Sequence, residues 1–110
     1  MSAKKLPAPP YYAVIFVNQR SEEDGEGYGQ TADHMVELAQ QQEGYLGIES
    51  VRDAKGKGIT VSYWRDMNAI KDWKNNLEHS DARNNGRDKW YEDYQLQIAK
   101  VEQGYRWIKS

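Results

Sequence analysis

The stretch Tyr11–Gln19, YYAVIFVNQ, decides the fold of this chain. It is rich in β-branched and aromatic residues, which favour a β-strand. A strand with one face in water alternates apolar and polar residues, but here both faces are largely apolar. The two faces are Tyr11, Ala13, Ile15 and Val17, and Tyr12, Val14, Phe16 and Asn18. We therefore expect this strand to be covered on both sides.

A helix and two strands are predicted after this first strand. The helix is expected from about Gln30 to Gln42, after a charged, glycine-rich connection, Ser21–Gly29. Gly44 stands where a left-handed cap would end such a helix. The strands Tyr45–Asp53 and Ile59–Arg65 are joined by a short turn that contains glycine, which predicts a hairpin.

A second helix and a last strand complete the predicted order. Asp66 is expected to cap a helix with one apolar stripe, formed by Ile70, Trp73 and Leu77. The last strand is expected from about Tyr94 to Val101, and a continuation through Tyr105 is left open. The order β-α-β-β-α-β predicts an α+β, ferredoxin-like fold with both helices on one face of a four-stranded antiparallel sheet.

The second face of that sheet needs an explanation, because the first strand is apolar on both sides. A second copy of the chain that packs sheet to sheet would cover it, which predicts a homodimer with a barrel-like interior. In the alternative, Tyr11, Tyr12 and Phe16 pack under the tail or a loop. We expect residues 1–10 to form a flexible N-terminal tail and residues 11–110 to form a single domain.

The composition excludes several classes of protein. With 15 Lys and Arg against 17 Asp and Glu, the net charge of −2 offers no basic surface for nucleic acid. The absence of cysteine excludes disulfides, a cysteine nucleophile and cysteine-ligated metals. No apolar run is long enough for a membrane span, and no leader peptide opens the chain. A soluble, cytoplasmic protein is the expectation.

Several short motifs, in this order and spacing, resemble a known family. They are Gly44-Tyr45-Leu46-Gly47, Ser62-Tyr63-Trp64, Trp73-Lys74, Glu78-His79, Gly86-Arg87 and Trp90-Tyr91-Glu92-Asp93-Tyr94. Together they are similar to the antibiotic biosynthesis monooxygenase (ABM) family of the dimeric α/β-barrel superfamily, in particular to its small stand-alone bacterial members. The likeness covers roughly Tyr11 to Tyr105.

The resemblance implies a dimer with a pocket between sheet and helices that admits a flat aromatic molecule. Some relatives oxygenate such a substrate with molecular oxygen and no cofactor, others cleave heme, and others have no established reaction. The heme-cleaving pattern has an Asn late in the first strand, a Trp, and an axial His ten residues after the Trp. Asn18 and Trp73 fit, but the third position is Arg83, which has no lone pair for iron. Heme is therefore disfavoured, and no cofactor is expected.

Cofactor-free oxygenation requires a general base, donors for a substrate anion and a dry aromatic slot. Asn18, Trp73 and His79 are the candidate catalytic residues, with Asn18 as donor and His79 as base. Phe16, Trp64 and Arg83 are the candidate substrate-binding residues. The predicted function is oxidation of a flat aromatic or quinol-like molecule. No metal site is predicted.

Each candidate has a plainer interpretation that the sequence leaves open. Trp73 shares its stripe with Ile70 and is core by spacing, and Trp64 could lie between protomers. His79 could bond the last carbonyls of its helix, and Asn18 could belong to a turn. For the whole protein, the alternative is a non-catalytic dimeric module that binds a small apolar metabolite.

Overall fold

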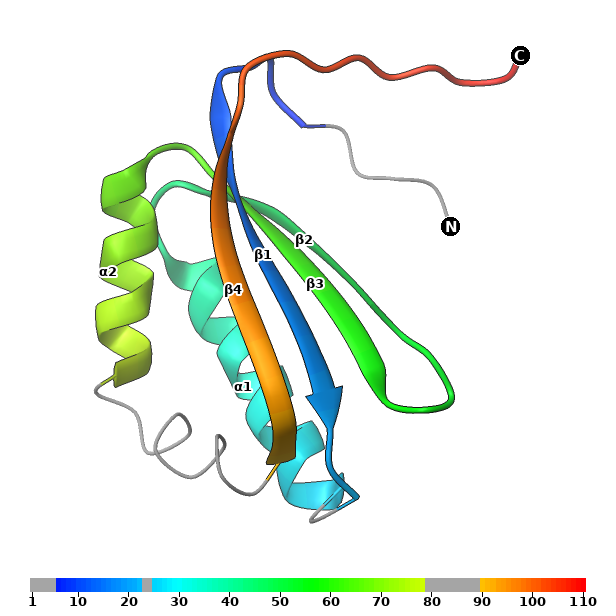
Figure 1. The fold of residues 1–110 in the computed structure, drawn as a ribbon. Helices are drawn as coiled ribbons and strands as arrows, with labels where there is room; N and C mark the ends of the chain where they lie inside the picture. Colours follow the sequence, from blue (N-terminus) through cyan, green and yellow to red (C-terminus); the bar gives the residue numbers. More distant parts are fainter. Residues whose placement is uncertain (1–5, 23–24, 79–89) are drawn as a thin grey trace.

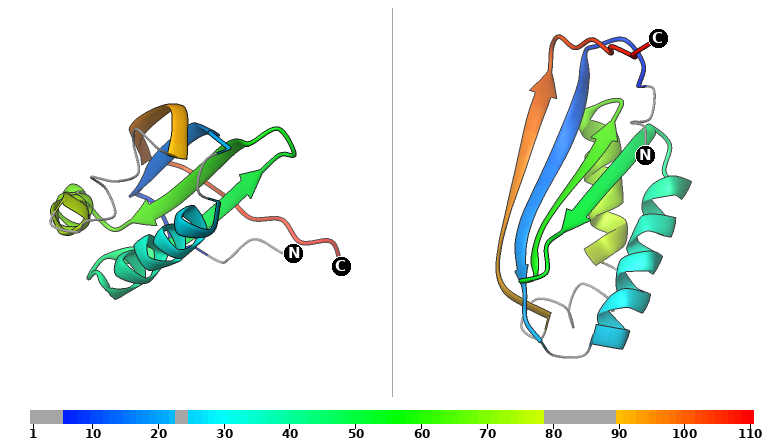
Figure 2. Two further views of the ribbon diagram at one scale, coloured as in Figure 1. Left: turned by 90° about the horizontal axis from the view of Figure 1, so that it is seen from below. Right: turned by 90° about the vertical axis from the view of Figure 1, so that its right-hand side faces the viewer.

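The computed structural model describes residues 6–22, 25–78 and 90–110, and it has the predicted order of elements (Figure 1). The strands are β1 (Tyr11–Arg20), β2 (Tyr45–Arg52), β3 (Lys57–Trp64) and β4 (Tyr91–Val101). The helices are α1 (Gly25–Gln41) and α2 (Met67–Glu78). All pairs in the sheet are antiparallel, in the order β2-β3-β1-β4. Both helices lie on the same side of the sheet (Figure 2), so the ferredoxin-like α+β prediction is confirmed.

β1 lies between β3 and β4, and its two faces meet different surroundings. On the helix-facing side, Val14 joins a core cluster with residues of both helices and of β3: Ala39, Trp64, Ala69 and Ile70. Tyr12 packs against the same cluster. On the opposite side, which we call the open face, no element of the described chain covers the centre of the sheet (Figure 2).

The open face is apolar at its centre. The register places Ile15 opposite Val61 and Val17 opposite Ile59, and Val51 of β2 lies opposite Ile59 in turn. Val51 is 70% exposed and Ile59 is 41% exposed. Only Tyr11, at the end of β1, lies beside the N-terminal segment Leu6–Pro9. Of the three residues in the alternative, Tyr11, Tyr12 and Phe16, only Tyr11 thus lies beside the tail.

The first helix begins earlier than predicted, at Gly25 instead of about Gln30. The prediction that Ser21–Gly29 forms a connection is therefore wrong from Gly25 onward. Glycines in a helix cost about 1 kcal/mol each, which is why the sequence pattern favoured a loop there. Tertiary contacts outweigh that cost. The ring of Tyr28, in this first part of α1, packs edge to face against Trp90 and Tyr91.

The last strand also differs from its prediction at both ends. It begins at Tyr91 instead of Tyr94, because an irregularity in the ladder between Gln19 and Arg20 lets Tyr91 pair with Arg20. It ends at Val101, opposite Tyr11, and the continuation through Tyr105 is wrong. The residues before Tyr11 are prolines, which lack the N–H that a longer ladder would need.

The two helices approach each other closely where α1 ends and α2 begins. Gly44 has a positive φ of 89°, as predicted for the left-handed cap of α1. A Cβ on Gly44 would lie 2.7 Å from the Cβ of Ala69, so a side chain there would displace α2. No helix in the described parts of the chain is long and apolar enough to cross a membrane.

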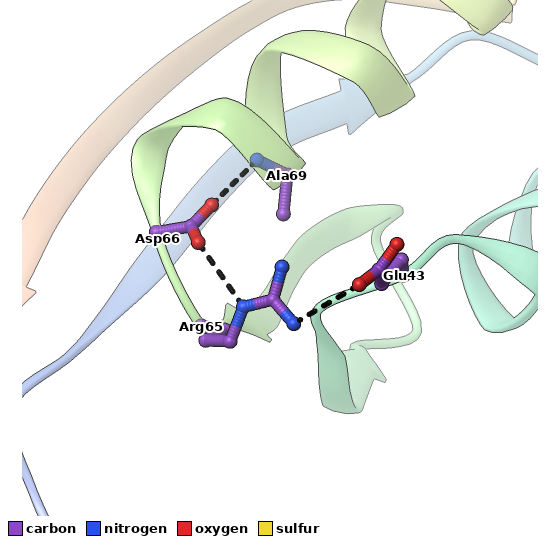
Figure 3. Close-up of polar contacts among 4 residues, drawn as sticks. All are labelled: Glu43, Arg65, Asp66 and Ala69. Carbon is purple, nitrogen blue, oxygen red and sulfur yellow. Dashed lines mark hydrogen bonds and ion pairs between the residues drawn. The ribbon is translucent and has the colours of Figure 1, made fainter.

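Asp66 caps α2, as predicted from the sequence (Figure 3). The Ala69 N–H donates to Asp66 Oδ1 at 2.8 Å, and Arg65 Nε donates to Oδ2 at 3.1 Å. Arg65 also pairs with Glu43, beyond the end of α1, at 3.5 Å. The backbone N–H of Ala69 and the Arg65 guanidinium hold the pKa of the Asp66 carboxyl below its usual range.

We expect Asp66→Ala to lower the midpoint of thermal unfolding, because the first turn of α2 loses its cap. Asp66→Asn keeps a capping oxygen but loses the carboxylate charge, so at pH 7 it should unfold below the wild type and above Asp66→Ala. The lowered pKa means that the charged carboxylate stabilises the fold above about pH 4 and that this contribution is lost on further acidification. Thermal unfolding between pH 2.5 and 7 should therefore show the difference between wild type and Asp66→Asn shrinking at low pH. An equal acid response in both proteins would contradict this role.

Candidate active site

The helix-facing side of the sheet carries two separate aromatic groups. The first, which we call the aromatic cluster, consists of Phe16, Tyr28, Trp90, Tyr91 and Tyr94. The second, which we call the tryptophan stack, consists of Tyr45, Trp64 and Trp73. Val14 lies between them on β1, and among the described residues no ring contact joins the two.

Asn18 lies beside the aromatic cluster, inside β1, with Gly58 opposite it on β3 and Tyr94 opposite it on β4. It shares the helix-facing side with Val14 and Phe16, because side chains alternate along a strand. Only 1% of Asn18 is exposed. Within the described residues, neither its Nδ2 nor its Oδ1 has a hydrogen-bond partner.

A buried amide without hydrogen-bond partners lowers the stability of a fold. Each unsatisfied buried donor or acceptor costs about 1–3 kcal/mol, and almost all such groups in proteins are paired with protein, water or ligand. Ser62 provides the comparison within this sheet, since it is 2% exposed but accepts a hydrogen bond from Trp64 Nε1 at 2.9 Å. Asn18 has donor and acceptor capacity that the described residues do not use.

The aromatic cluster brings together rings from three elements on the same side of the sheet as this amide. Phe16 of β1 lies 5.5 Å from Tyr91 and 5.6 Å from Tyr94, centroid to centroid. Tyr28 of α1 lies 5.7 Å from Tyr91 and 5.9 Å from Trp90. Edge-to-face pairs at these separations hold the rings in fixed orientations. The cluster is therefore an ordered aromatic wall.

Two arginines lie at the outer side of the aromatic cluster. The Arg20 guanidinium covers the Tyr28 ring at 3.9 Å, and Arg20 Nη1 donates to the Trp90 carbonyl. Arg52 Nη2 donates to the Tyr28 hydroxyl at 2.8 Å. These contacts tie β1 and β2 to the first turns of α1.

Burial raises the pKa of the Tyr91 hydroxyl well above its usual range, and the neighbouring Tyr28 hydroxyl raises it further, against the opposing effect of Arg52 and Arg20. Tyr91 therefore stays a neutral O–H at physiological pH. It can donate a hydrogen bond, but it cannot serve there as a base.

A strip of β4 next to the aromatic cluster remains accessible on the helix-facing side. Leu96 is opposite Phe16 and Ile98 is opposite Val14, yet they are 50% and 43% exposed. Tyr94, opposite Asn18, is 43% exposed. An apolar strip of this kind on the inner side of a sheet can receive a flat apolar molecule.

The tryptophan stack lies further along the sheet. Trp64 is opposite Tyr12, six residues from Asn18 along β1, or about 20 Å at the rise of a strand. The rings of Trp64 and Trp73 stack at 4.9 Å and 28°. Trp64 is fully buried on the helix-facing side, so the alternative that it lies between protomers is wrong.

Trp73 packs against the core, as its spacing with Ile70 predicts. It is half-buried, and its Nε1 is buried without a hydrogen-bond partner in the described chain. The structure therefore brings Phe16 together with Asn18, and Trp64 together with Trp73, as two groups. The alternative that Asn18 belongs to a turn is wrong, because it pairs with strands on both sides.

Two predicted site residues, His79 and Arg83, lie outside the described residues. Six residues described at the aromatic cluster were not predicted as site residues: Arg20, Tyr28, Arg52, Trp90, Tyr91 and Tyr94. Tyr28 was assigned to a glycine-rich connection, although it continues the apolar stripe of α1 by helical spacing. Tyr91 and Tyr94 belong to a motif that carried the family resemblance but received no role.

No set of three or more His, Cys, Asp or Glu side chains in residues 6–22, 25–78 and 90–110 is placed to hold a metal ion. The groups that this site offers to a ligand are aromatic rings, an amide and arginine side chains. They suit an uncharged or anionic aromatic molecule, which rings can sandwich and the amide can orient.

Comparison with known proteins places this chain in a family. The family model "Antibiotic biosynthesis monooxygenase" matches residues 10–85. The chain belongs to the antibiotic biosynthesis monooxygenase (ABM) family. This confirms the resemblance stated from the sequence motifs.

Three ABM-related proteins illustrate the range of similarity. "Uncharacterized protein YqjZ" of Bacillus subtilis is 56% identical over 98 residues, which cover 89% of this chain and 85% of that protein. "Jasmonate monooxygenase ABM" of Pyricularia oryzae is 32% identical over 63 residues, or 54% of this chain and 29% of that longer protein. The crystal structure of SnoaB, a cofactor-independent oxygenase from Streptomyces nogalater, has a TM-score of 0.68 at 10% identity, covering 87% of this chain and 97% of SnoaB.

Asn18→Leu should leave the free energy of unfolding unchanged or raise it, because the substitution keeps the volume and removes an unpaired amide. Ser62→Ala is the matched control, since Ser62 is equally buried but paired. It should destabilise by about 1 kcal/mol, because the Trp64 N–H loses its acceptor. Urea unfolding followed by tryptophan fluorescence measures both. A loss of more than about 1 kcal/mol in Asn18→Leu would show that the fold uses the amide.

Proposed function

We propose that this protein is a cytoplasmic, cofactor-independent monooxygenase that oxidises a flat aromatic or quinol-like molecule with molecular oxygen. The observation that carries the proposal is Asn18, a buried amide with no hydrogen-bond partner in the part of the chain that the structure describes, beside an ordered aromatic cluster. Membership in the ABM family supports the type of reaction. So does the similarity in fold to SnoaB, a cofactor-independent oxygenase from Streptomyces nogalater.

The proposed binding mode places the substrate on the helix-facing side of β1 and β4. Its ring system would lie on the accessible strip of Leu96 and Ile98, with Phe16 and Tyr94 at its edges. Asn18 Nδ2 would donate to an oxygen of the substrate. Trp73, with its Nε1 unpaired among the described residues, and Trp64 behind it would close the opposite end of the slot, beyond Val14 and about 20 Å along the sheet from Asn18.

The chemistry needs an electron-rich substrate anion, which can pass an electron to oxygen without a metal or flavin. His79, which follows the last residue of α2, is the proposed base that takes the proton from the substrate. Asn18 stabilises the resulting oxyanion, and Arg83 adds positive charge. In the net reaction a CH₂ group and O₂ become a C=O group and water, so one oxygen atom enters the substrate.

The second proposed feature is a homodimer through the open face of the sheet. Val17, Val61 and Ile59 form the apolar centre of that face, and one copy alone leaves it in water. Two copies packed face to face would bury it in the manner of a sandwich, with the two sheets about 10 Å apart.

Oxygen uptake should be measured with a panel of anthrones, hydroxynaphthoquinols and polyketide phenols, with hemin included. The panel is first screened by thermal unfolding. A ligand at one hundred times its dissociation constant adds about 2.7 kcal/mol, or roughly 10 °C in a domain of this size. With the best ligand, Asn18→Leu should lower the rate of oxygen uptake about 100-fold, as expected for loss of an oxyanion donor.

Trp73→Phe and His79→Ala should also lower that rate, whereas Ser62→Ala should retain it if it is assayed below its unfolding temperature. A ligand that binds without oxygen uptake would favour the alternative, a dimeric module that binds a small apolar metabolite. A thermal shift with hemin alone would contradict the cofactor-free assignment.

Val17→Lys should shift the protein from dimer to monomer at micromolar concentration, because a lysine at the centre of the open face is buried unpaired in the dimer. Ala54→Lys, in the exposed turn between β2 and β3, is the control and should remain a dimer. Sedimentation velocity over a concentration series distinguishes the two. A Val17→Lys protein that still sediments as a dimer would exclude the open face as the interface.

A further inference from the structure

The chain after β4 forms an extended arm, residues 102–110, that leaves the body of the molecule. Figure 1 shows it running from the end of β4 to the side of the molecule opposite α2. Three large apolar side chains on this arm are exposed to an unusual degree: Tyr105 by 97%, Trp107 by 75% and Ile108 by 67%. Apolar side chains grouped in this way mark a surface that binds a partner.

A groove lies at the base of the arm, at the end of the open face. It has a volume of about 420 Å³, and one wall is the N-terminal segment Leu6–Pro9. The arm residues Gly104–Arg106 form another wall, and the floor comes from Tyr11, Tyr63 and β2. This volume is within the range of pockets that take a small organic molecule, so it can take an indole side chain.

The charges of arm and groove are complementary. Glu49 lies in the groove, where its Oε2 accepts a hydrogen bond from the Tyr63 hydroxyl at 3.2 Å. The arm carries Arg106 and Lys109 on either side of Trp107 and Ile108. An arm that placed Trp107 in such a groove would bring a cation close to the carboxylate.

We propose that the arm of one copy docks in the groove of a second copy of this chain, with Trp107 as the anchor. The six residues from Val101, the last of β4, to Trp107 can span about 20 Å, which is twice the separation of two packed sheets. Each copy has one arm and one groove, so a two-fold axis satisfies both at once and closes the assembly. The arm then holds together a dimer whose sheets face each other.

This proposal is independent of the proposed oxygenase activity, and its first test is the strength of the dimer. Trp107→Ala should weaken dimerisation at least 100-fold, because a buried aromatic anchor is worth a factor of ten or more and the dimer contains two. Lys109→Ala, at an equally exposed site on the arm, should weaken it much less. Sedimentation equilibrium of each variant gives the dissociation constants. An unchanged constant for Trp107→Ala would overturn the proposal, and so would a wild-type protein that is monomeric at 100 micromolar.

A second test uses the absence of cysteine in this chain to trap the contact. Ala8→Cys, in the wall of the groove, and Lys109→Cys, on the arm, are prepared as separate proteins and mixed under mild oxidation. We expect a disulfide that joins position 8 of one copy to position 109 of the other, identified by mass spectrometry of the linked peptides. The double variant should give the same linkage between two chains. A linkage within one chain would show that the arm folds back on its own groove, which overturns the proposal.

Discussion

β1 must keep both of its faces from water, and the arrangement of the other elements follows from that requirement. Its helix-facing side is covered by α1 and α2 through the core around Val14, while β3 and β4 satisfy its backbone on either edge. The open face, with Val17 and Ile15, has no such cover from the described residues. The same strand therefore organises the interior of the molecule and leaves the apolar surface on which the proposed homodimer rests.

Asn18 is the exception on that strand, and its position gives it chemical significance. Every other residue of the helix-facing row of β1 from Tyr12 to Phe16 packs against apolar or aromatic neighbours. A leucine would fit the same pattern without the cost of an unpaired amide. The Asn18 amide lowers the stability of the fold, and it lies beside rings held by Arg20 and Tyr28. In the proposed oxygenase, such an amide can orient an oxygen of the substrate.

Much of this fold could be predicted from the sequence because its signals are local. The two apolar faces of YYAVIFVNQ, the positive φ of Gly44 and the cap formed by Asp66 each follow from nearby residues. The early start of α1 could not be predicted in this way. It depends on contacts of Tyr28 with Trp90 and Tyr91, which are more than sixty residues away in the sequence.

The site was predictable only in part, for the same reason. Asn18 and Phe16 stand out from the pattern of their own strand, but their neighbours Tyr91 and Tyr94 come from the other end of the chain through the β1–β4 pairing. Trp73 is predicted both as a candidate and as core, and its stacking on Trp64 places it in the core, with its N–H buried and unpaired among the described residues.

The central claim is that the Asn18 amide serves a ligand and not the fold. Its side-chain NH₂ resonances can be followed by NMR in ¹⁵N-labelled protein, assigned by their loss in Asn18→Leu, during titration with the best phenolic ligand of the panel. The account predicts a large shift of both amide protons and slower exchange with water at saturation. Binding that shifts other resonances but leaves the Asn18 amide unchanged would contradict it.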